Sequence, residues 1–132
     1  MPAISPDEVV ETLERAHKLS VRVPPDEQAR HVQGVLGSRL AAAALGLKDS
    51  RTLSSWATGG PIRGAGNAHR LQVLFRVVTI VDETFGPAVA AAFLRGSNPV
   101  LGNRAPLMVL ADEDPVEAEP RLLAAVEALV TA

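Results

Sequence analysis

The 132-residue chain contains no cysteine and no tyrosine, and it has only one tryptophan and three phenylalanines. Without cysteine, neither disulfide bonds nor thiolate metal sites are possible. Aromatic residues make up 3% of the chain while hydrophobic residues make up 47%, so the core must consist mainly of Leu, Val and Ala. Stretches rich in Ala and poor in β-branched residues favour helix over sheet. We therefore expect an all-α protein.

Long hydrophobic runs are also absent. No segment reaches the roughly 20 apolar residues that a membrane-spanning helix needs, and the longest candidate, Leu71–Val81, is interrupted by Arg76. Acidic residues occupy the N-terminal region, where a secretory signal would begin with basic ones. The sequence therefore predicts a cytoplasmic protein without membrane contact. Its length fits one compact unit, or two very small ones that share a core.

Catalytic and cofactor motifs are missing as well. The three histidines have no metal-ligand spacing, and the Gly-rich run 59–66 lacks the Lys-Ser/Thr of a phosphate-binding loop. The acidic run 112–114 could hold a hard cation. Because Pro115 follows it, the first turn of a helix is the preferred interpretation. We expect no enzymatic activity, no cofactor and no metal.

The net charge of −2 hides a strong segregation of charge along the chain. Residues 1–29 hold three basic and six acidic side chains, and residues 105–132 hold one basic and six acidic ones. Residues 30–104 hold nine basic and three acidic side chains, a net charge of +6. A basic middle between acidic ends favours two different partners, one of them anionic. The alternative is that these charged side chains are only solvated surface residues and bind no partner.

Capping residues, glycines and prolines divide the chain into short helices. Ser5 is expected to cap the first helix, whose continuation 21–25 should be extended because proline disfavours a helical predecessor. Asp26 is expected to cap the second helix. Pro120 is expected to break the last one. The predicted helices after the first span residues 26–36, 39–47, 50–57, 67–84, 87–94 and 115–130, with brief helical pieces between 96 and 110.

Residues 40–59 carry the pattern of a helix-turn-helix. The small Ala42 would let two helices cross closely, and Gly46 would open the turn between them. Leu53 and Trp56, three residues apart, would anchor the second helix to the core. The alternative is an αα-corner with no role in nucleic-acid binding.

The outward face of that second helix would be polar and basic. Arginine can hydrogen-bond guanine in the major groove, and serine or threonine can contact bases or phosphates. The free N–H groups at the helix start could also bind a phosphate. With the basic linker 59–66 included, the predicted DNA-binding residues are Arg51, Thr52, Ser54, Ser55, Thr58 and Arg63.

The long helix 67–84 has two apolar stripes and should be buried on both sides. One face can cover the helix-turn-helix. The other face requires either the C-terminal helices or a second subunit, and a two-fold dimer would place two recognition helices at separated half-sites.

Residues 93–112 read FLRGSNPVLGNRAPLMVLAD. This stretch combines many apolar residues with Gly and Pro breakers, which predicts three brief helical pieces rather than one long helix. The pattern resembles the C-terminal toxin-binding domain of Xre/MbcA/ParS-type antitoxins, in which an aromatic-Leu pair precedes Asn-Pro, Leu-Gly and a Pro-Leu helix start. The run Gly46-Leu47-Lys48-Asp49-x-Arg51-Thr52-x-x-x-Trp56 is similar to the same family. Phe93 departs from its Trp.

The resemblance covers about residues 26–130 and implies a fold, a function and a partner. The fold would be an N-terminal Xre-like helix-turn-helix bundle, joined by a long central helix to a small toxin-binding domain. The function would be that of an antitoxin, which occludes a RES-domain toxin that degrades NAD⁺ and regulates its own operon. It implies toxin contacts through Phe93, Leu94, Asn98, Leu101, Arg104, Pro106, Leu107, Asp112, Glu113 and Asp114.

Three regions follow from these interpretations. They are an N-terminal helix with an extended linker (1–25), a DNA-binding region (26–60) and a region for dimerisation and toxin binding (61–132). The expected partners are a RES-domain toxin, operator DNA, and a second copy of the chain or a larger toxin–antitoxin assembly. The alternative functions are a stand-alone transcription regulator and a helical adaptor with no DNA role.

Overall fold

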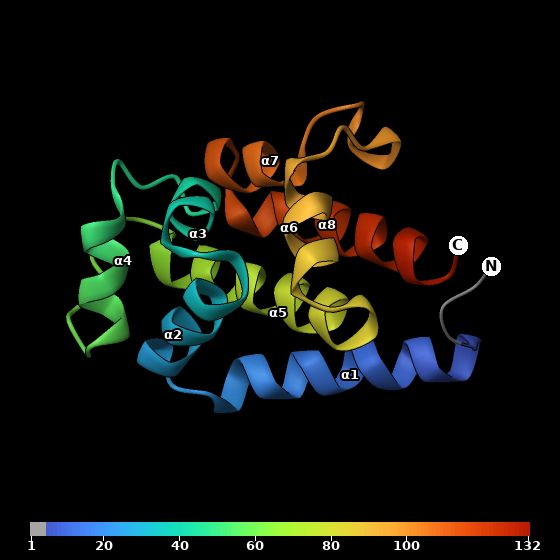
Figure 1. The fold of residues 1–132 in the computed structure, drawn as a ribbon, viewed down its shortest axis with the longest axis horizontal. Helices are drawn as coiled ribbons and strands as arrows, with labels where there is room; N and C mark the ends of the chain where they lie inside the picture. Colours follow the sequence, from blue (N-terminus) through green and yellow to red (C-terminus); the bar gives the residue numbers. More distant parts are fainter. Residues whose placement is uncertain (1–4) are drawn as a thin grey trace.

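The computed structural model describes residues 5–132, and in that range the secondary-structure elements are all helices, as predicted. The chain forms eight α-helices, one short 3-10 helix (η1) and no β-strand (Figure 1). Their order along the chain is α1 Pro6–Arg22, α2 Pro25–Leu36, α3 Ser38–Ala44, α4 Ser50–Ala57, α5 Asn67–Phe85, α6 Pro87–Arg95, η1 Pro99–Leu101, α7 Pro106–Asp112 and α8 Pro115–Val130.

The first helix begins as predicted but ends later. The Ser5 side chain accepts a hydrogen bond from the Glu8 N–H. The helix then continues through Arg22, so the extended backbone expected for 21–25 is confined to Val23 and Pro24. The reason is steric, because a proline restricts only the residue directly before it. The predicted cap of α2 was also wrong.

Asp26 lies inside the first turn of α2 instead of capping it. Pro24 occupies the cap position and supplies no side-chain hydrogen bond. In the first turn, the negative charge of Asp26 still interacts favourably with the positive end of the helix dipole. Its carboxylate also pairs with Arg30, one turn further on, at 3.3 Å.

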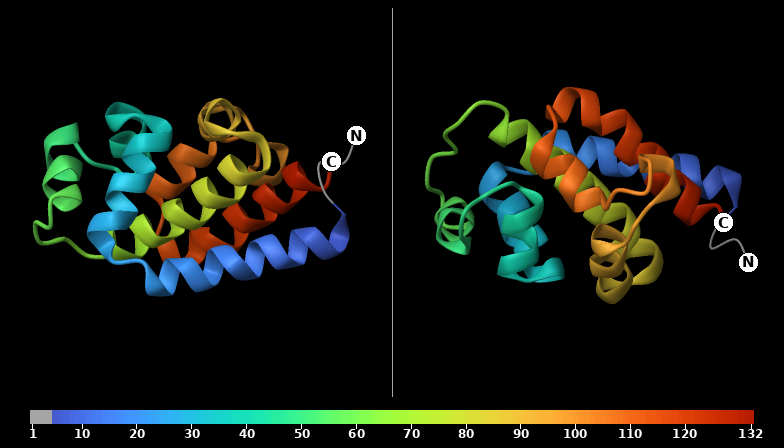
Figure 2. Two further views of the ribbon diagram at one scale, coloured as in Figure 1. Left: turned by 60° about the horizontal axis from the view of Figure 1, so that its bottom comes forward. Right: turned by 90° about the horizontal axis from the view of Figure 1, so that it is seen from above.

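Helix α5 lies within the bundle and is covered on all its apolar sides. It contacts α1, α2, α6, α7 and α8, and Figure 2 shows these helices arranged around it. Nine of its residues are buried, from Leu71 to Val81. Of the two predicted covers for its second face, the chain's own C-terminal helices supply it. Burial of this face therefore requires no second subunit.

One hydrophobic cluster runs through the described part of the chain. Its buried members extend from Val9 in α1 to Val130 in α8, and they include Leu53 and Trp56 of α4. The three regions predicted from the sequence thus share a single core. None of the three regions has a separate hydrophobic core.

Pro120 does not break α8, contrary to expectation. The helix continues through it to Val130. Pro120 removes only the hydrogen bond to the Val116 carbonyl, and both residues are exposed, so water can serve that carbonyl. The opposite face anchors the helix, because it buries Ala118, Leu122, Ala125, Val126 and Val130.

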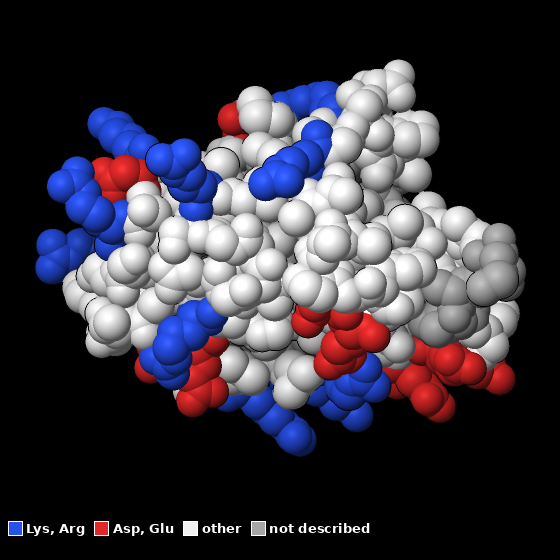
Figure 3. Space-filling model, viewed as in Figure 1, with Lys and Arg blue, Asp and Glu red and all other residues white. Residues whose placement is uncertain are grey.

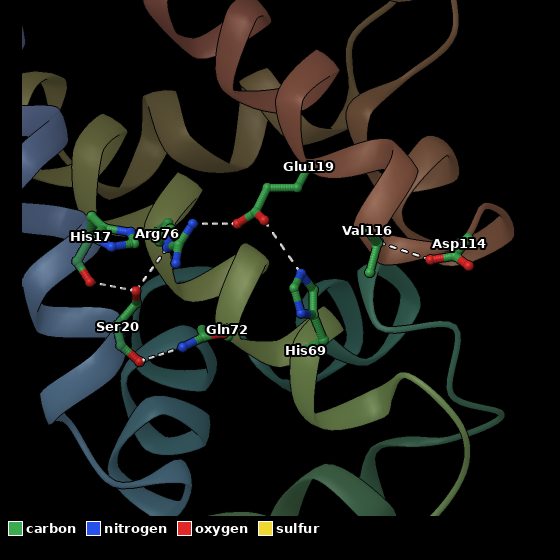
Figure 4. A network of polar contacts seen from close by, with 8 residues as sticks. All are labelled: His17, Ser20, His69, Gln72, Arg76, Asp114, Val116 and Glu119. Atoms are coloured by element: carbon green, nitrogen blue, oxygen red, sulfur yellow. Dashed lines mark hydrogen bonds and ion pairs between the residues drawn. The ribbon is translucent and has the colours of Figure 1, made fainter.

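A polar network ties α1, α5 and α8 together (Figure 4). The guanidinium of Arg76 pairs with Glu119 and donates from Nε to the Ser20 hydroxyl at 2.7 Å. Glu119 also lies 3.3 Å from Nε2 of His69, and Gln72 donates to the Ser20 carbonyl at 2.9 Å. The Arg76 side chain is only 12% exposed. Its charge is therefore compensated within the protein, as a buried charge requires.

The corner between α7 and α8 is a second junction. A side chain at Gly46 would lie 3.1 Å from the Ala111 carbonyl oxygen, so the α3–α4 connection packs directly on the end of α7. From α5, Arg70 donates to the Leu110 carbonyl at 2.8 Å and to the Glu113 carbonyl at 3.2 Å. Three elements distant in sequence therefore meet at this corner.

Candidate functional site

The first candidate surface is the outward face of α4. Leu53 and Trp56 are buried and point into the core, which confirms the inward register inferred from their spacing. The remaining side chains predicted on this helix and its end are exposed, namely Arg51, Thr52, Ser54, Ser55 and Thr58. Three of them, Arg51, Ser54 and Thr58, take part in internal side-chain hydrogen bonds.

Ser54 in α4 and Thr58 at its end use their hydroxyl groups in internal hydrogen bonds. The Ser54 hydroxyl accepts from Gln33 Nε2 at 3.2 Å, and the Thr58 hydroxyl donates to the Ser54 and Ser55 carbonyls. Because hydroxyl groups can exchange partners, these bonds position the side chains without removing them from the surface. Arg51, Thr52 and Ser55 form the more available group.

The start of α4 is already occupied by a carboxylate, so the free N–H groups predicted there are not all available. Asp49 caps the helix by accepting from the Arg51 N–H at 2.9 Å. Its second oxygen lies 3.0 Å from the Arg51 guanidinium. The hydrogen bond from Arg51 lowers the pKa of Asp49, which is therefore ionised at neutral pH.

The segment after α4 is not the loose linker that its glycines indicated. The Gly60 N–H donates to the Ser55 carbonyl at 2.8 Å. Asn67, at the start of α5, donates from its side chain to the Arg63 carbonyl at 2.7 Å. Between them, the half-buried Ile62 packs against the core. Arg63 is therefore presented on an ordered loop.

Helix α4 and this loop enclose a surface hollow of about 400 Å³. It brings together three of the predicted DNA-binding residues of α4 with Arg63 of the loop, although they come from separate segments. The full lining comprises Arg51, Thr52, Ser55, Trp56, Pro61 and Arg63. No acidic side chain lines it.

The surroundings of the hollow are basic. Figure 3 shows Lys and Arg side chains gathered at the end of the molecule formed by α3 and α4. Arg39 and Lys48 are exposed and line a neighbouring depression at the α3–α4 connection. The site prediction omitted both. The net charge of +6 on residues 30–104 was the sequence feature that could have indicated that Arg39 and Lys48 belong to the same basic surface.

The second candidate surface is the segment from the end of α6 to the start of α8. As predicted, it consists of short helical pieces separated by Gly and Pro. Asn98 closes the middle turn, because its N–H donates to the Arg104 carbonyl at 3.1 Å and its side chain accepts from the Val100 N–H at 3.0 Å. Gly102 and Asn103 have φ values of 65° and 66°. These left-handed residues reverse the chain tightly, and Gly and Asn tolerate that conformation best.

The apolar residues predicted to bind a toxin differ in accessibility. Leu94, Leu101 and Pro106 are buried, while Phe93 and Leu107 are half-buried. The buried three support the segment from within, so a partner could reach them only if the segment opened. The exposed apolar side chains here are Val100 and Met108, each 45% exposed. The resemblance did not single out either residue.

The acidic residues of this segment are engaged within the protein. Arg104 pairs with Asp112 at 3.1 Å and with Glu113 at 2.7 Å. Arg121 pairs with Glu113 as well. Asp114 caps α8 by accepting from the Val116 N–H. The acidic cluster therefore presents less charge to a partner than the sequence suggested.

Among residues 5–132, no group of three His, Cys, Asp or Glu side chains could hold a metal ion. None of the described helices is long and apolar enough to cross a membrane. No family model, no curated protein and no solved structure matches the chain.

Proposed function

We propose that the protein is an antitoxin that neutralises a RES-domain toxin through the segment between α6 and α8. The pattern of residues 93–110 supplies the family resemblance. The geometry of that segment supports it, because the turn around η1 projects from the helical body (Figure 1) and is closed by its own hydrogen bonds. A preorganised projection loses little conformational freedom on binding.

The observation that carries the proposal is the pair of exposed apolar side chains in this closed segment. Val100 and Met108 are each about half exposed, although the buried Leu101 and Val109 lie beside them in sequence. Such side chains suit the desolvated centre of a protein interface. The neighbouring carboxylates are paired with Arg104 and Arg121. Apolar contact should therefore contribute more to affinity than electrostatic steering.

The test is co-expression with the product of the neighbouring gene, followed by pull-down. A RES-domain reading frame should be found there, and the two proteins should co-purify. The double variant Val100→Asp, Met108→Asp should lose both co-purification and protection of cells. Val21→Asp is the matched control, because Val21 is 66% exposed on α1, outside the segment. Protection by the folded double variant would contradict the proposal.

A second part of the proposed function is DNA binding by α4, through which the antitoxin would regulate its operon. The observation that favours it is the basic hollow, where Arg51 and Arg63 converge without an acidic lining residue. The helix would approach the major groove as part of a helix-turn-helix formed with α3. A dimer or a toxin complex would supply the second half-site through a surface other than α5.

Electrophoretic shifts on the upstream DNA of the gene separate the alternatives. An antitoxin binds both the toxin and the DNA, a stand-alone regulator binds only the DNA, and an adaptor binds neither its upstream DNA nor any other duplex. The double variant Arg51→Ala, Arg63→Ala should lose the shift at moderate salt. An unchanged shift would show that these arginines do not contact DNA.

A further inference from the structure

The hollow between α4 and the loop of residues 58–66 has a shape and chemistry that suggest a defined role. We propose that it is a cradle for one phosphodiester group of the DNA backbone, flanking the bases that α4 faces. The inference rests on the proposed DNA-binding function and adds the ligand group, its position and the loop that holds it. Four observations carry it.

The first observation is that the usual place for a phosphate is taken. A helix N-terminus binds phosphate through its free N–H groups. At α4, the Asp49 carboxylate already accepts from the Arg51 N–H and bears a negative charge, since its pKa is lowered. A phosphate at this point would meet like charge. The backbone must therefore be bound elsewhere on this face.

The second observation is the set of donors around the hollow. Arg51 of α4 and Arg63 of the loop both line it, together with Thr52 and Ser55, which carry hydroxyl groups. Arginine and hydroxyl side chains are the groups that most often contact DNA phosphates. The Arg51 side chain is 90% exposed and can turn from Asp49 into the hollow. Arg63 forms no ion pair with any residue in the described range 5–132.

The third observation is that the loop is fixed against α4. A Cβ at Gly60 would lie 2.8 Å from the Ser55 carbonyl oxygen and 2.2 Å from its hydroxyl, so only glycine fits there. Pro61 restricts the next backbone position. Asn67 holds the Arg63 carbonyl at 2.7 Å. The distance between Arg63 and α4 is thus set before DNA arrives, which reduces the entropic cost of the contact.

The fourth observation supplies a reporter. Trp56 lines the hollow and is the only tryptophan of the chain. The residue is 2% exposed, so it cannot stack on a base and should respond to charge and packing changes beside it. Trp56 also borders a second depression with Pro25 and Ile62, so its emission is read together with the effect of the Arg63 variants.

The experiment is a titration of Trp56 emission with duplex DNA from the upstream region, repeated at several salt concentrations. Arg63→Ala should weaken binding roughly five- to tenfold, equally for specific and unrelated duplexes, and lower the salt slope by about 1, because one phosphate contact is lost. Arg63→Lys should recover part of the affinity. Gly60→Ala should weaken binding to a similar degree although it changes no charge.

Matched variants keep the test decisive. Gly34→Ala is the control for Gly60→Ala, because no atom lies within 4 Å of the added Cβ. It should bind like the original protein. If Gly60→Ala fails to fold by circular dichroism, Asn67→Ala takes its place, since it releases the Arg63 carbonyl from the α5 side. Asn67→Ala should then show the same loss of affinity.

The outcomes distinguish failure of the phosphate cradle from failure of the proposed DNA-binding function. If the unaltered protein binds no duplex, the proposed DNA-binding function is wrong, and the cradle with it. If it binds, but Arg63→Ala keeps both the affinity and the salt slope, only the cradle is wrong. A change in Trp56 emission with millimolar inorganic phosphate, unaffected by a saturating duplex, would identify a free-phosphate site and also overturn the cradle.

Discussion

At the scale of single residues, Asp49 has two opposing effects. It stabilises the start of α4 as a cap, and it holds Arg51 in an ion pair. The cap is needed for folding, whereas the ion pair competes with any anionic partner for the guanidinium. Because the two effects use different properties of the side chain, they can be separated by substitution.

Asp49→Asn should tighten DNA binding several-fold. Asparagine is as good an N-cap as aspartate, so α4 keeps its start while Arg51 is released from the negative charge. Filter binding or Trp56 emission would measure the change. Asp26→Asn, which removes a similar ion pair on α2, should leave DNA affinity nearly unchanged. If both variants changed DNA affinity equally, the cause would be the change in net charge of the protein rather than the release of Arg51.

The same variant predicts a pH effect on stability. The pKa of Asp49 is lowered in the folded state, so its contribution is present above the ordinary pKa of the carboxyl group. It is lost as the pH falls through the lowered value. Urea denaturation between pH 5 and pH 2 should show a shallower loss of stability for Asp49→Asn than for the original chain. If the two proteins lost stability equally as the pH fell, ionisation of Asp49 would not contribute to the free energy of unfolding.

Trp56→Ala should destabilise the protein by about 3–5 kcal/mol, the range for removing a large aromatic side chain from a core. The residue is buried in the main hydrophobic cluster. Thermal melting followed by circular dichroism would measure the loss. Ser54→Ala, on the exposed face of the same helix, is the control and should melt within a few degrees of the original. A Trp56→Ala variant that melts unchanged would contradict its core role.

At the scale of whole elements, local signals predicted helix starts well. Three helices begin at the predicted prolines, Pro87, Pro106 and Pro115, and Ser5 caps the first helix as expected. These starts are local, because capping depends on a few neighbouring residues. The prediction failed where distant packing decides. Pro120 would end an isolated helix, but the buried opposite face of α8 holds the helix together across it.

Candidate sites show the same division. The outward face of α4 was readable from the spacing of Leu53 and Trp56. The convergence of Arg63 with that face was not, because it depends on how Gly60 packs against Ser55. Likewise, the pairing of Arg104 with the acidic residues of α7 follows from the turn around η1. Sequence showed the charges there but could not show that they compensate one another.

Pro120→Ala should stabilise the protein, by up to about 3 kcal/mol, the difference in helix propensity between proline and alanine. It restores the hydrogen bond to the Val116 carbonyl, and the site is exposed, so no packing is lost. Chemical denaturation would measure the gain. Ala128→Pro, at another exposed position of α8, should be strongly destabilising. A destabilised Pro120→Ala would contradict the view that Pro120 costs the helix only a hydrogen bond.

At the scale of the whole molecule, the shared core changes what a truncation can show. Removal of residues 105–132 would leave the predicted DNA-binding region folded only if the closing helix did not complete the core. It does complete it, because α8 buries five apolar side chains beyond Pro115 and packs on α5. We therefore expect the truncated protein to be unfolded by circular dichroism. A cooperative melt of residues 1–104 would contradict the single core.

The corner between α7 and α8 couples the two candidate surfaces mechanically. Gly46 of the α3–α4 connection and Arg70 of α5 both pack on the end of α7, so the proposed DNA-binding and toxin-binding surfaces share one scaffold. A substitution that shifts the end of α7 should therefore displace both surfaces together.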